Sequence, residues 1–151
     1  MEFPNHILIP ELRRLLDEGH ATVTLPLRGR SMRPFLEDGR DKALLALPES
    51  LHGGCLQVGD AVLAEISPGH YVLHRIIVRE DHQLTLKGDG NLQGVEHCTI
   101  DDVRGVVTKY IRPGGHVLMA DDPKLKRKIK LWGKLPTFVR RVCLFIYRQT
   151  I

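Results

Sequence analysis

The chain of 151 residues has few cysteines and no long apolar run. Cys55, Cys98 and Cys143 lie far apart and none forms a Cys-x-x-Cys pair, so we expect neither a disulfide framework nor a zinc ribbon. Three reduced thiols are typical of a cytosolic protein, which is the location we expect. No stretch approaches the roughly 20 apolar residues of a membrane-spanning helix. Arg13 and Arg14 interrupt the N-terminal segment, which therefore lacks the pattern of a signal peptide.

Acidic residues are absent from Lys124 to Ile151, a segment that holds nine basic residues. Because the whole chain has a net charge of +4, residues 1–123 carry −5. A charge run is most often a solvated helix face. We expect this segment to pack on the rest of the chain first. Peripheral contact of residues 124–148 with an anionic inner membrane surface is the second interpretation. No specific nucleic acid is expected, since the segment lacks a recognition module.

Short alternating segments dominate the middle of the chain and predict β-strands. The candidates are residues 22–27, 43–47, 61–66, 71–78, 83–87, 105–111 and 116–119. Turn signals at Ser67-Pro68-Gly69 and Arg112-Pro113-Gly114-Gly115 separate neighbouring strands. Short strands at this spacing predict a mostly β fold, a compact antiparallel domain.

Helical patterns frame this β region on both sides. Residues 9–18 predict a short helix, with Pro10 in its first turn and Gly19 at its end. Residues 124–150 predict a basic helical tail that is interrupted near Gly133 and Pro136. We therefore divide the chain into an N-terminal helical segment, a β domain and a basic amphipathic tail. Their bounds are residues 1–21, 22–120 and 121–151.

Ser31 and His74 are the residues that could carry nucleophilic chemistry. Ser31 lies between a strand and the turn made by Met32, Arg33 and Pro34, and a nucleophilic serine needs a rigid, exposed position with a base in reach. Taken alone, a serine before a turn is more often a cap. His74 lies on the core-directed face of its strand, where a satisfied core histidine is the ordinary interpretation.

A carboxylate near His74 depends on the register of the following hairpin. If the turn at residues 79–82 is symmetric, His74 faces Lys87 and Asp89 is its diagonal neighbour on the same face. Asp89 could then hold the imidazole tautomer and stabilise its charged form. A shift of one residue would instead put Asp89 on the opposite face.

Four short motifs together resemble the signal peptidase I/LexA superfamily of serine peptidases. They are Gly29-x-Ser31-Met32-x-Pro34, Gly59-Asp60-x-Val62-Leu63, His74-Arg75-Ile76 and Lys87-Gly88-Asp89-x-Asn91. Their order and spacing cover residues 22–111. The nearest chemistry is that of eukaryotic-type and archaeal signal peptidases, which use histidine as the general base.

This resemblance implies a fold of the LexA/signal peptidase type and a role for each matching residue. Ser31 would be the nucleophile and a backbone oxyanion donor, His74 the base, and Asp89 the assisting carboxylate. A second acidic position of the family falls near Asp101 and Asp102. Gly59 and Asp60 would be structural and open their strand.

Metal binding is not expected, and neither is a cofactor. His70 and His74 have a spacing of four residues, but on a strand this separates them by about 13 Å. Glu96-His97-Cys98 is compact, yet no matching ligand pair accompanies it.

The sequence thus predicts a serine endopeptidase that cleaves a peptide or precursor protein bound as an extended strand. The cleaved segment would be a leader met inside the cell or at the inner membrane surface. The alternative is a catalytically weak or inactive module that keeps the fold and holds a peptide. Gly29 and Arg30 motivate this alternative, because the family often has a small hydroxyl residue and a glycine there.

Overall fold

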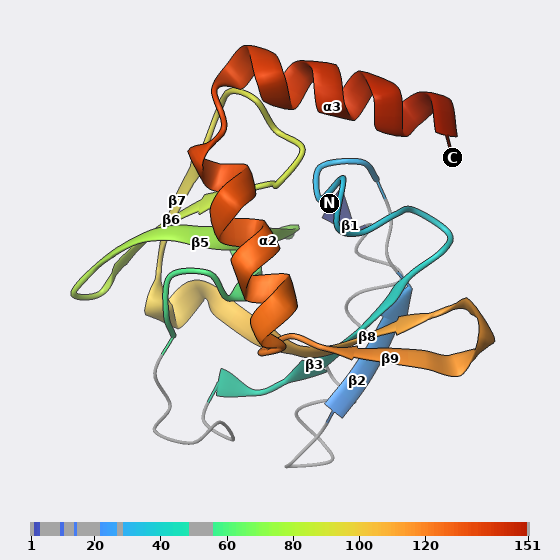
Figure 1. The fold of residues 1–151 in the computed structure, drawn as a ribbon. Helices are drawn as coiled ribbons and strands as arrows, with labels where there is room; N and C mark the ends of the chain where they lie inside the picture. The colour runs from blue at the N-terminus through green and yellow to red at the C-terminus, as the bar shows by residue number, and fades with distance from the viewer. Residues whose placement is uncertain are drawn as a thin grey trace.

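The computed structural model describes residues 2–3, 10, 14, 22–26, 29–48 and 56–150. The described chain is mostly antiparallel β-sheet followed by two C-terminal helices (Figure 1). The strands are β1 (Glu2–Phe3), β2 (Thr22–Pro26), β3 (Lys42–Ala46), β4 (Ala61–Ser67), β5 (His70–Glu80), β6 (Gln83–Lys87), β7 (Glu96–Thr99), β8 (Val103–Arg112) and β9 (His116–Met119). Two short 3-10 turns, η3 (Ile100–Asp102) and η4 (Pro113–Gly115), flank β8. The mostly β, antiparallel fold expected from the sequence is confirmed.

The sheet runs in the order β2-β3-β8-β4-β5-β6-β7, with β1 added to β5 and β9 added to β8. Each pair of neighbours is antiparallel. All seven strand segments expected from alternation are present, two of them with the expected bounds and the others with bounds shifted by one or two residues. β1 and β7 were not expected, and β7 matters most because it begins at Glu96.

The two faces of the sheet carry two separate hydrophobic cores. On β5, Val72 belongs to one core and Leu73 to the other, as the alternation of a strand requires. The first core includes Ile76 and Leu86, and the second includes Met32. Full burial of a side chain of this size stabilises a fold by about 1.5–3 kcal/mol. The two cores fix which side of the sheet each neighbouring polar residue faces.

Helix α2 (Pro123–Lys134) begins where Asp122 accepts hydrogen bonds from the backbone N–H groups of Lys124 and Leu125, at 2.8 and 3.1 Å. It packs on the second core of the sheet through Leu125 and against the loops that hold Phe35 and Asp89 through Trp132, and both side chains are buried. Its lysines point outward. The packing that we expected first for the basic tail is therefore present in this helix.

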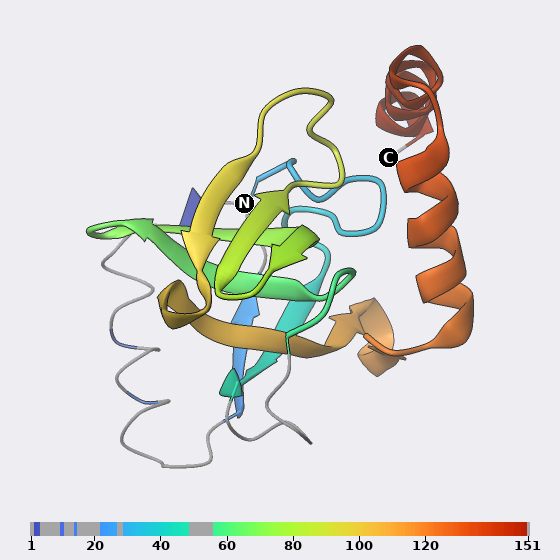
Figure 2. The ribbon, with the colours of Figure 1, turned by 90° about the vertical axis from the view of Figure 1, so that its left-hand side faces the viewer.

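Helix α3 (Thr137–Thr150) follows after a break at Leu135 and Pro136, close to the expected interruption. Figure 2 shows α2 and α3 together as one side of the molecule, beside the loops that follow β6 and precede β3. Phe138 and Phe145 of α3 are exposed, whereas Trp132 of α2 is buried.

Several expectations concern other parts of the chain. The helix expected at residues 9–18 falls almost wholly outside the described residues, as does Cys55. Cys98 is a buried free thiol and Cys143 an exposed one. None of the described helices has the length and the apolar character that crossing a bilayer requires.

Candidate active site

Ser31 is held in a tight turn that is anchored by a buried neighbour. Gly29 enters the turn with a φ of +87°, a conformation that favours glycine. The carbonyl of Arg30 accepts a hydrogen bond from the N–H of Arg33 at 3.2 Å. Met32 is fully buried in the second core, whereas Ser31 itself is half-buried. Packing of Met32 therefore fixes the turn and leaves the adjacent hydroxyl within reach of the sheet.

His74 lies in the middle of β5 and is almost completely buried, with 3% of its surface exposed. It pairs with Val62 of β4 in the sheet register. Its Nε2 atom is 3.1 Å from Ser31 Oγ, within hydrogen-bond distance. The structure thus brings together the serine and the histidine singled out in the sequence, although 43 positions separate them.

The other ring nitrogen of His74 is bonded to Glu96, a residue that sequence reasoning missed. His74 Nδ1 is 2.8 Å from Glu96 Oε2. The sheet register explains this contact, because Glu96 pairs with Leu86, and Leu86 pairs with Ile76. Ile76 is two residues from His74, so all these side chains lie on one face of the sheet. In the sequence, Glu96 attracted notice only as part of a compact Glu-His-Cys run.

The electrostatics of His74 favour a neutral imidazole. Burial lowers its pKa below the usual 6.5, because a charged ring loses its hydration there. The hydrogen bond and the negative charge of Glu96 oppose this shift without reversing it. A neutral ring that donates from Nδ1 to Glu96 has a free electron pair on Nε2. That pair faces the Ser31 hydroxyl and can accept its proton.

The expected contact between Asp89 and His74 is not formed. Asp89 is buried, and its two carboxylate oxygens accept hydrogen bonds from Arg75 Nε and Nη2 at 2.8 and 2.7 Å. This is a bidentate ion pair on the opposite face of β5. Asp89 therefore fixes the loop after β6, while Glu96 occupies the place beside His74.

A β-bulge near Ile77 explains this exchange of partners. The hairpin turn pairs Glu80 with Gln83, and that register alone would set Asp89 opposite His74. The register then shifts between Ile76 and Val78, so that Lys87 pairs with Arg75. Continued beyond Lys87, the shifted register puts Asp89 on the face of Arg75. A single extra residue in one strand thus moves the carboxylate to the other side of the sheet.

Two glycines allow the loop after β6 to lie directly against the Ser31 turn. A Cβ on Gly88 would be 2.4 Å from the Ser31 carbonyl oxygen, and one on Gly90 would be 2.9 Å from that of Arg30. The N–H of Gly90 also donates to the Ser31 carbonyl at 2.7 Å. Only residues without side chains permit this approach.

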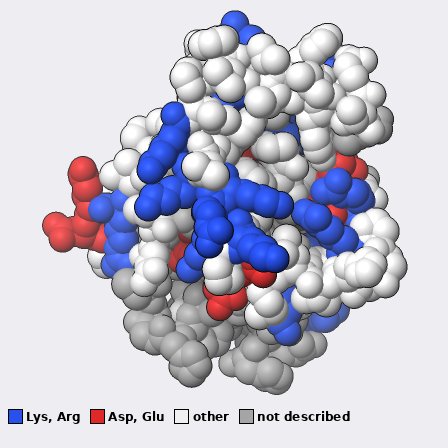
Figure 3. Space-filling view, in the orientation of Figure 1, with Lys and Arg blue, Asp and Glu red and all other residues white. Residues whose placement is uncertain are grey.

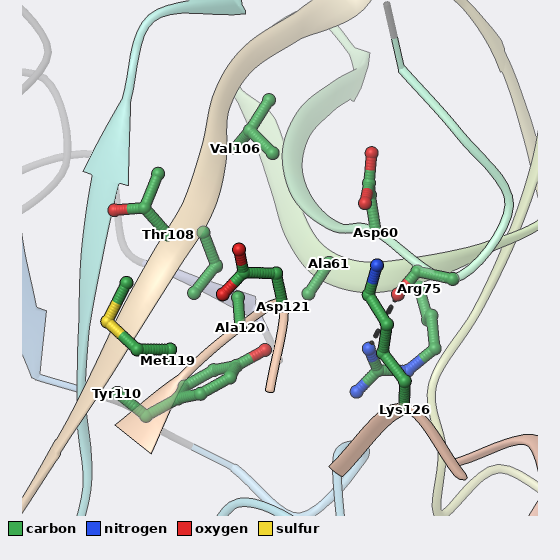
Figure 4. A pocket seen from close by; sticks show the side chains of 12 residues that line it. Asp60, Ala61, Arg75, Val106, Thr108, Tyr110, Met119, Ala120, Asp121 and Lys126 are labelled. Atoms are coloured by element: carbon green, nitrogen blue, oxygen red, sulfur yellow. Dashed lines mark hydrogen bonds between the residues drawn. The ribbon is translucent and has the colours of Figure 1, made fainter. Parts of the chain in front are cut away.

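Helix α2 and strand β4 support the same loop from the other side. Trp132 Nε1 donates to the backbone carbonyl of Asp89 at 2.7 Å, and the Trp132 ring meets Phe35 edge-on. Arg75 Nη1 donates to the carbonyl of Gly59 at 2.9 Å (Figure 4). Figure 4 also shows Asp60 beside Arg75, at a cavity of about 220 Å³. Gly59, with a φ of +101°, and Asp60 open β4, the structural role that we expected for them.

Asp101 and Asp102 do not contact His74. Asp102 accepts from the backbone N–H and hydroxyl of Thr99, at 2.8 and 3.2 Å, and so caps η3. Asp101 is exposed, 3.4 Å from His82. The second acidic position expected near these residues is therefore occupied by a turn cap and a surface side chain.

A cavity of about 300 Å³ adjoins the Ser31 turn. Arg30, Arg33 and Gly90 line one side of it, and α3 supplies the other side. The charged lining side chains are all arginines, one of which, Arg33, is paired with Glu37. The space beside the serine thus attracts negative charge.

Comparison of the chain with protein-family models, with curated proteins and with solved structures found no match. Among the described residues, no three His, Cys, Asp or Glu side chains gather as metal ligands would. The arrangement of Ser31, His74 and Glu96 is therefore interpreted from its own geometry. A hydroxyl, an imidazole and a carboxylate joined in series can activate the hydroxyl as a nucleophile.

Proposed function

We propose that the chain is a serine endopeptidase in which Ser31 is the nucleophile, His74 the general base and Glu96 the residue that orients the base. One observation carries the proposal: His74 is bonded through Nε2 to Ser31 and through Nδ1 to Glu96, at 3.1 and 2.8 Å. A serine that merely capped a turn would need neither contact, and a core histidine would need only one.

The proposed reaction follows the chemistry of acyl transfer. Ser31 Oγ attacks the scissile carbonyl carbon while its proton passes to His74 Nε2, and Glu96 stabilises the imidazolium that forms. His74 then gives the proton to the leaving amine, and a water molecule hydrolyses the acyl–serine ester by the same steps in reverse. The backbone N–H of Ser31 is the proposed donor to the oxyanion.

We further propose that the fold is of the LexA/signal peptidase type. Support comes from the way in which the sequence motifs meet. The Ser31 turn lies against the Gly88–Gly90 loop, and that loop is held by Arg75, the neighbour of His74. The family resemblance assigned the assisting role to Asp89, so the use of Glu96 would be a feature of this chain.

The proposed substrate is a peptide or precursor segment bound in extended form beside Ser31. Arg30, Arg141 and Arg148 line the adjoining cavity, so acidic side chains near the scissile bond are favoured. The free thiols of Cys98 and Cys143 fit the cytosolic location that we propose.

A fluorophosphonate probe tests the proposal without knowledge of the substrate. Ser31 Oγ would form a bond to phosphorus, fluoride would leave, and the proton would pass to His74. We expect intact-mass labelling of the wild-type chain at Ser31, no labelling of Ser31→Ala or His74→Ala, and full labelling of the control Ser67→Ala, which changes an exposed serine at the end of β4. A folded wild-type chain that stays unlabelled, yet binds peptides, would establish the non-catalytic module instead.

A further inference from the structure

Helix α3 presents an apolar stripe to solvent. Phe138, Val142, Phe145 and Ile146 are 51–68% exposed, and their spacing of four, three and one residues puts them along one side of the helix. The half-buried residues of α3 that face the domain include Arg140, Leu144 and Tyr147, which lie on the opposite side. This is the reverse of an ordinary surface helix, whose apolar side faces the core.

Basic side chains lie beside this stripe on α3 and cover the neighbouring α2. Arg141 and Arg148 are exposed on α3 beside it. Figure 3 shows a broad group of Lys and Arg side chains over α2, with the uncharged atoms of α3 above it. The exposed cations of α2 are Lys124, Lys126, Arg127, Lys128, Lys130 and Lys134. No acidic residue occurs in either helix.

We propose that the apolar stripe of α3 docks on an anionic lipid surface, with the cations of α2 and α3 at the headgroups. An apolar strip flanked by Lys and Arg is the pattern of helices that lie in the membrane interface. Each cation near such a surface adds about 1 kcal/mol of attraction. Pairing of the stripe with a second copy of this chain would bring two basic faces together, which like-charge repulsion opposes.

Helix α3 lies beside the Ser31 turn, so docking through α3 would determine which substrates meet the serine. The Arg33 guanidinium lies over the Tyr147 ring, with Cζ 5.8 Å from the ring centroid, and Arg33 belongs to the Ser31 turn. The cavity of about 300 Å³ separates Arg30 from Phe145 and Arg148. A docked chain therefore holds the Ser31 turn on the other side of α3 from the lipid, about one helix diameter of 10 Å away, near membrane-tethered precursor segments. This substrate class rests on the proposed peptidase activity, whereas the docking does not.

Vesicle sedimentation tests the docking. We expect the wild-type chain to bind mixed phosphatidylcholine–phosphatidylglycerol vesicles at least about tenfold more tightly than pure phosphatidylcholine vesicles at low salt. The double variant Phe138→Ser/Phe145→Ser should lose about tenfold or more of that binding with an unchanged melting temperature. Val117→Ser, which alters an exposed side chain on β9, is the matched control and should bind as the wild type does.

Equal binding to both vesicle types, or an equal loss in the Val117 control, would overturn the proposal. A concentration-dependent dimer abolished by the double variant, without vesicle binding, would assign the stripe to a second copy. If the wild-type chain neither bound vesicles nor formed a dimer, the lipid proposal would be refuted and the stripe would be assigned to a protein partner. Ser31→Ala should sediment as the wild type does, which separates docking from catalysis.

A fluorophosphonate carried on a lipid anchor tests the substrate class. In anionic vesicles it should label Ser31 at least about tenfold faster than its water-soluble counterpart, and the double variant should remove this advantage. Labelling by the soluble probe without that advantage would refute the tethered substrate and leave the peptidase intact. Absence of labelling by both probes, with vesicle binding retained, would refute the peptidase and leave the docking intact.

Discussion

Glu96 Oε2 lies 2.8 Å from His74 Nδ1, on the side of the imidazole ring that faces away from Ser31. The carboxylate comes from β7, two strands away from β5, and reaches the ring across the end of β6. It thereby fixes the tautomer in which Nε2 carries no proton. Each residue of the proposed relay lies in a different segment. Ser31 lies in the turn that follows β2, His74 lies in β5 and Glu96 lies in β7.

Replacement of Glu96 by Gln should slow the chemistry without unfolding the chain. The amide keeps the shape of the side chain but cannot stabilise the imidazolium, and loss of such a carboxylate lowers rates by roughly 10⁴-fold in related relays. The rate of fluorophosphonate labelling and the thermal midpoint are the measurements. Asp101→Asn, at an exposed carboxylate, is the control and should change neither. A full labelling rate in Glu96→Gln would remove Glu96 from the relay.

The labelling rate should rise with pH to a plateau, with a midpoint below 6.5. His74 must be neutral to accept the Ser31 proton, and burial lowers its pKa from 6.5 despite the hydrogen bond to Glu96. In Glu96→Gln the midpoint should move lower still, because the negative charge that raises this pKa is gone. A pH series on both variants checks this, and a midpoint that moves upward would contradict it.

The same lowered pKa predicts the sign of a stability change. Between the folded pKa and 6.5, the unfolded chain binds more protons at this histidine than the folded chain does. The contribution of His74 to the free energy of unfolding is therefore fully present above 6.5 and decreases as the pH falls through the folded pKa. Denaturant titrations at several pH values give the free energy of unfolding of the wild type and of His74→Gln. In that pH window the free energy of the wild type should fall more steeply with decreasing pH than that of the variant.

Replacement of Asp89 by Asn should destabilise the folded chain, and its effect should not be confined to the rate of labelling. The change leaves the buried Arg75 guanidinium without its carboxylate, and breaking a buried pair costs about 3–5 kcal/mol. Glu65→Gln breaks the partly exposed Arg104–Glu65 pair, with atoms 3.6 Å apart, and is the matched control. Its cost should stay below about 1 kcal/mol. Urea denaturation measures both, and equal costs would show that Asp89 has no special structural role.

Replacement of Gly88 by Ala should displace Ser31. The new Cβ would meet the Ser31 carbonyl at 2.4 Å, so the turn must move and the hydroxyl must leave His74. Labelling should fall by about 100-fold or more, since a misplacement of 1 Å costs that much. Gly133→Ala adds the same methyl group in α2 with no atom within 4 Å. It should label normally and gain about 0.5–1 kcal/mol of stability.

The fold was largely predictable from local patterns. Alternation and the turn signals located most of the strands, and Pro136 located the break between the two helices. β7 was not predicted, because Glu96, His97 and Cys98 form too short a segment for the alternation of a strand to be recognised. The exposure of the α3 stripe matched only the second interpretation of the tail, since helical spacing shows that a stripe exists but not which way it faces.

The site was only partly predictable, because one β-bulge decides which carboxylate reaches His74. Ser31 and His74 were found from their motifs, but their contact depends on a long-range approach. The choice between Asp89 and Glu96 depends on the register shift between Ile76 and Val78. Nothing in the sequence of β5 marks that shift, and it decides which face each carboxylate occupies.

The hydrogen bond from Trp132 to Asp89 joins α2 to the site in a mechanical sense. Asp89 is flanked by Gly88, which lies under Ser31, and by Gly90, which donates to the Ser31 carbonyl. A displacement of α2 should therefore move the three consecutive residues from Gly88 to Gly90 against the Ser31 turn. A chain shortened before α2 would lose that connection. A ligand that displaced the helices would shift the Ser31 hydroxyl relative to His74.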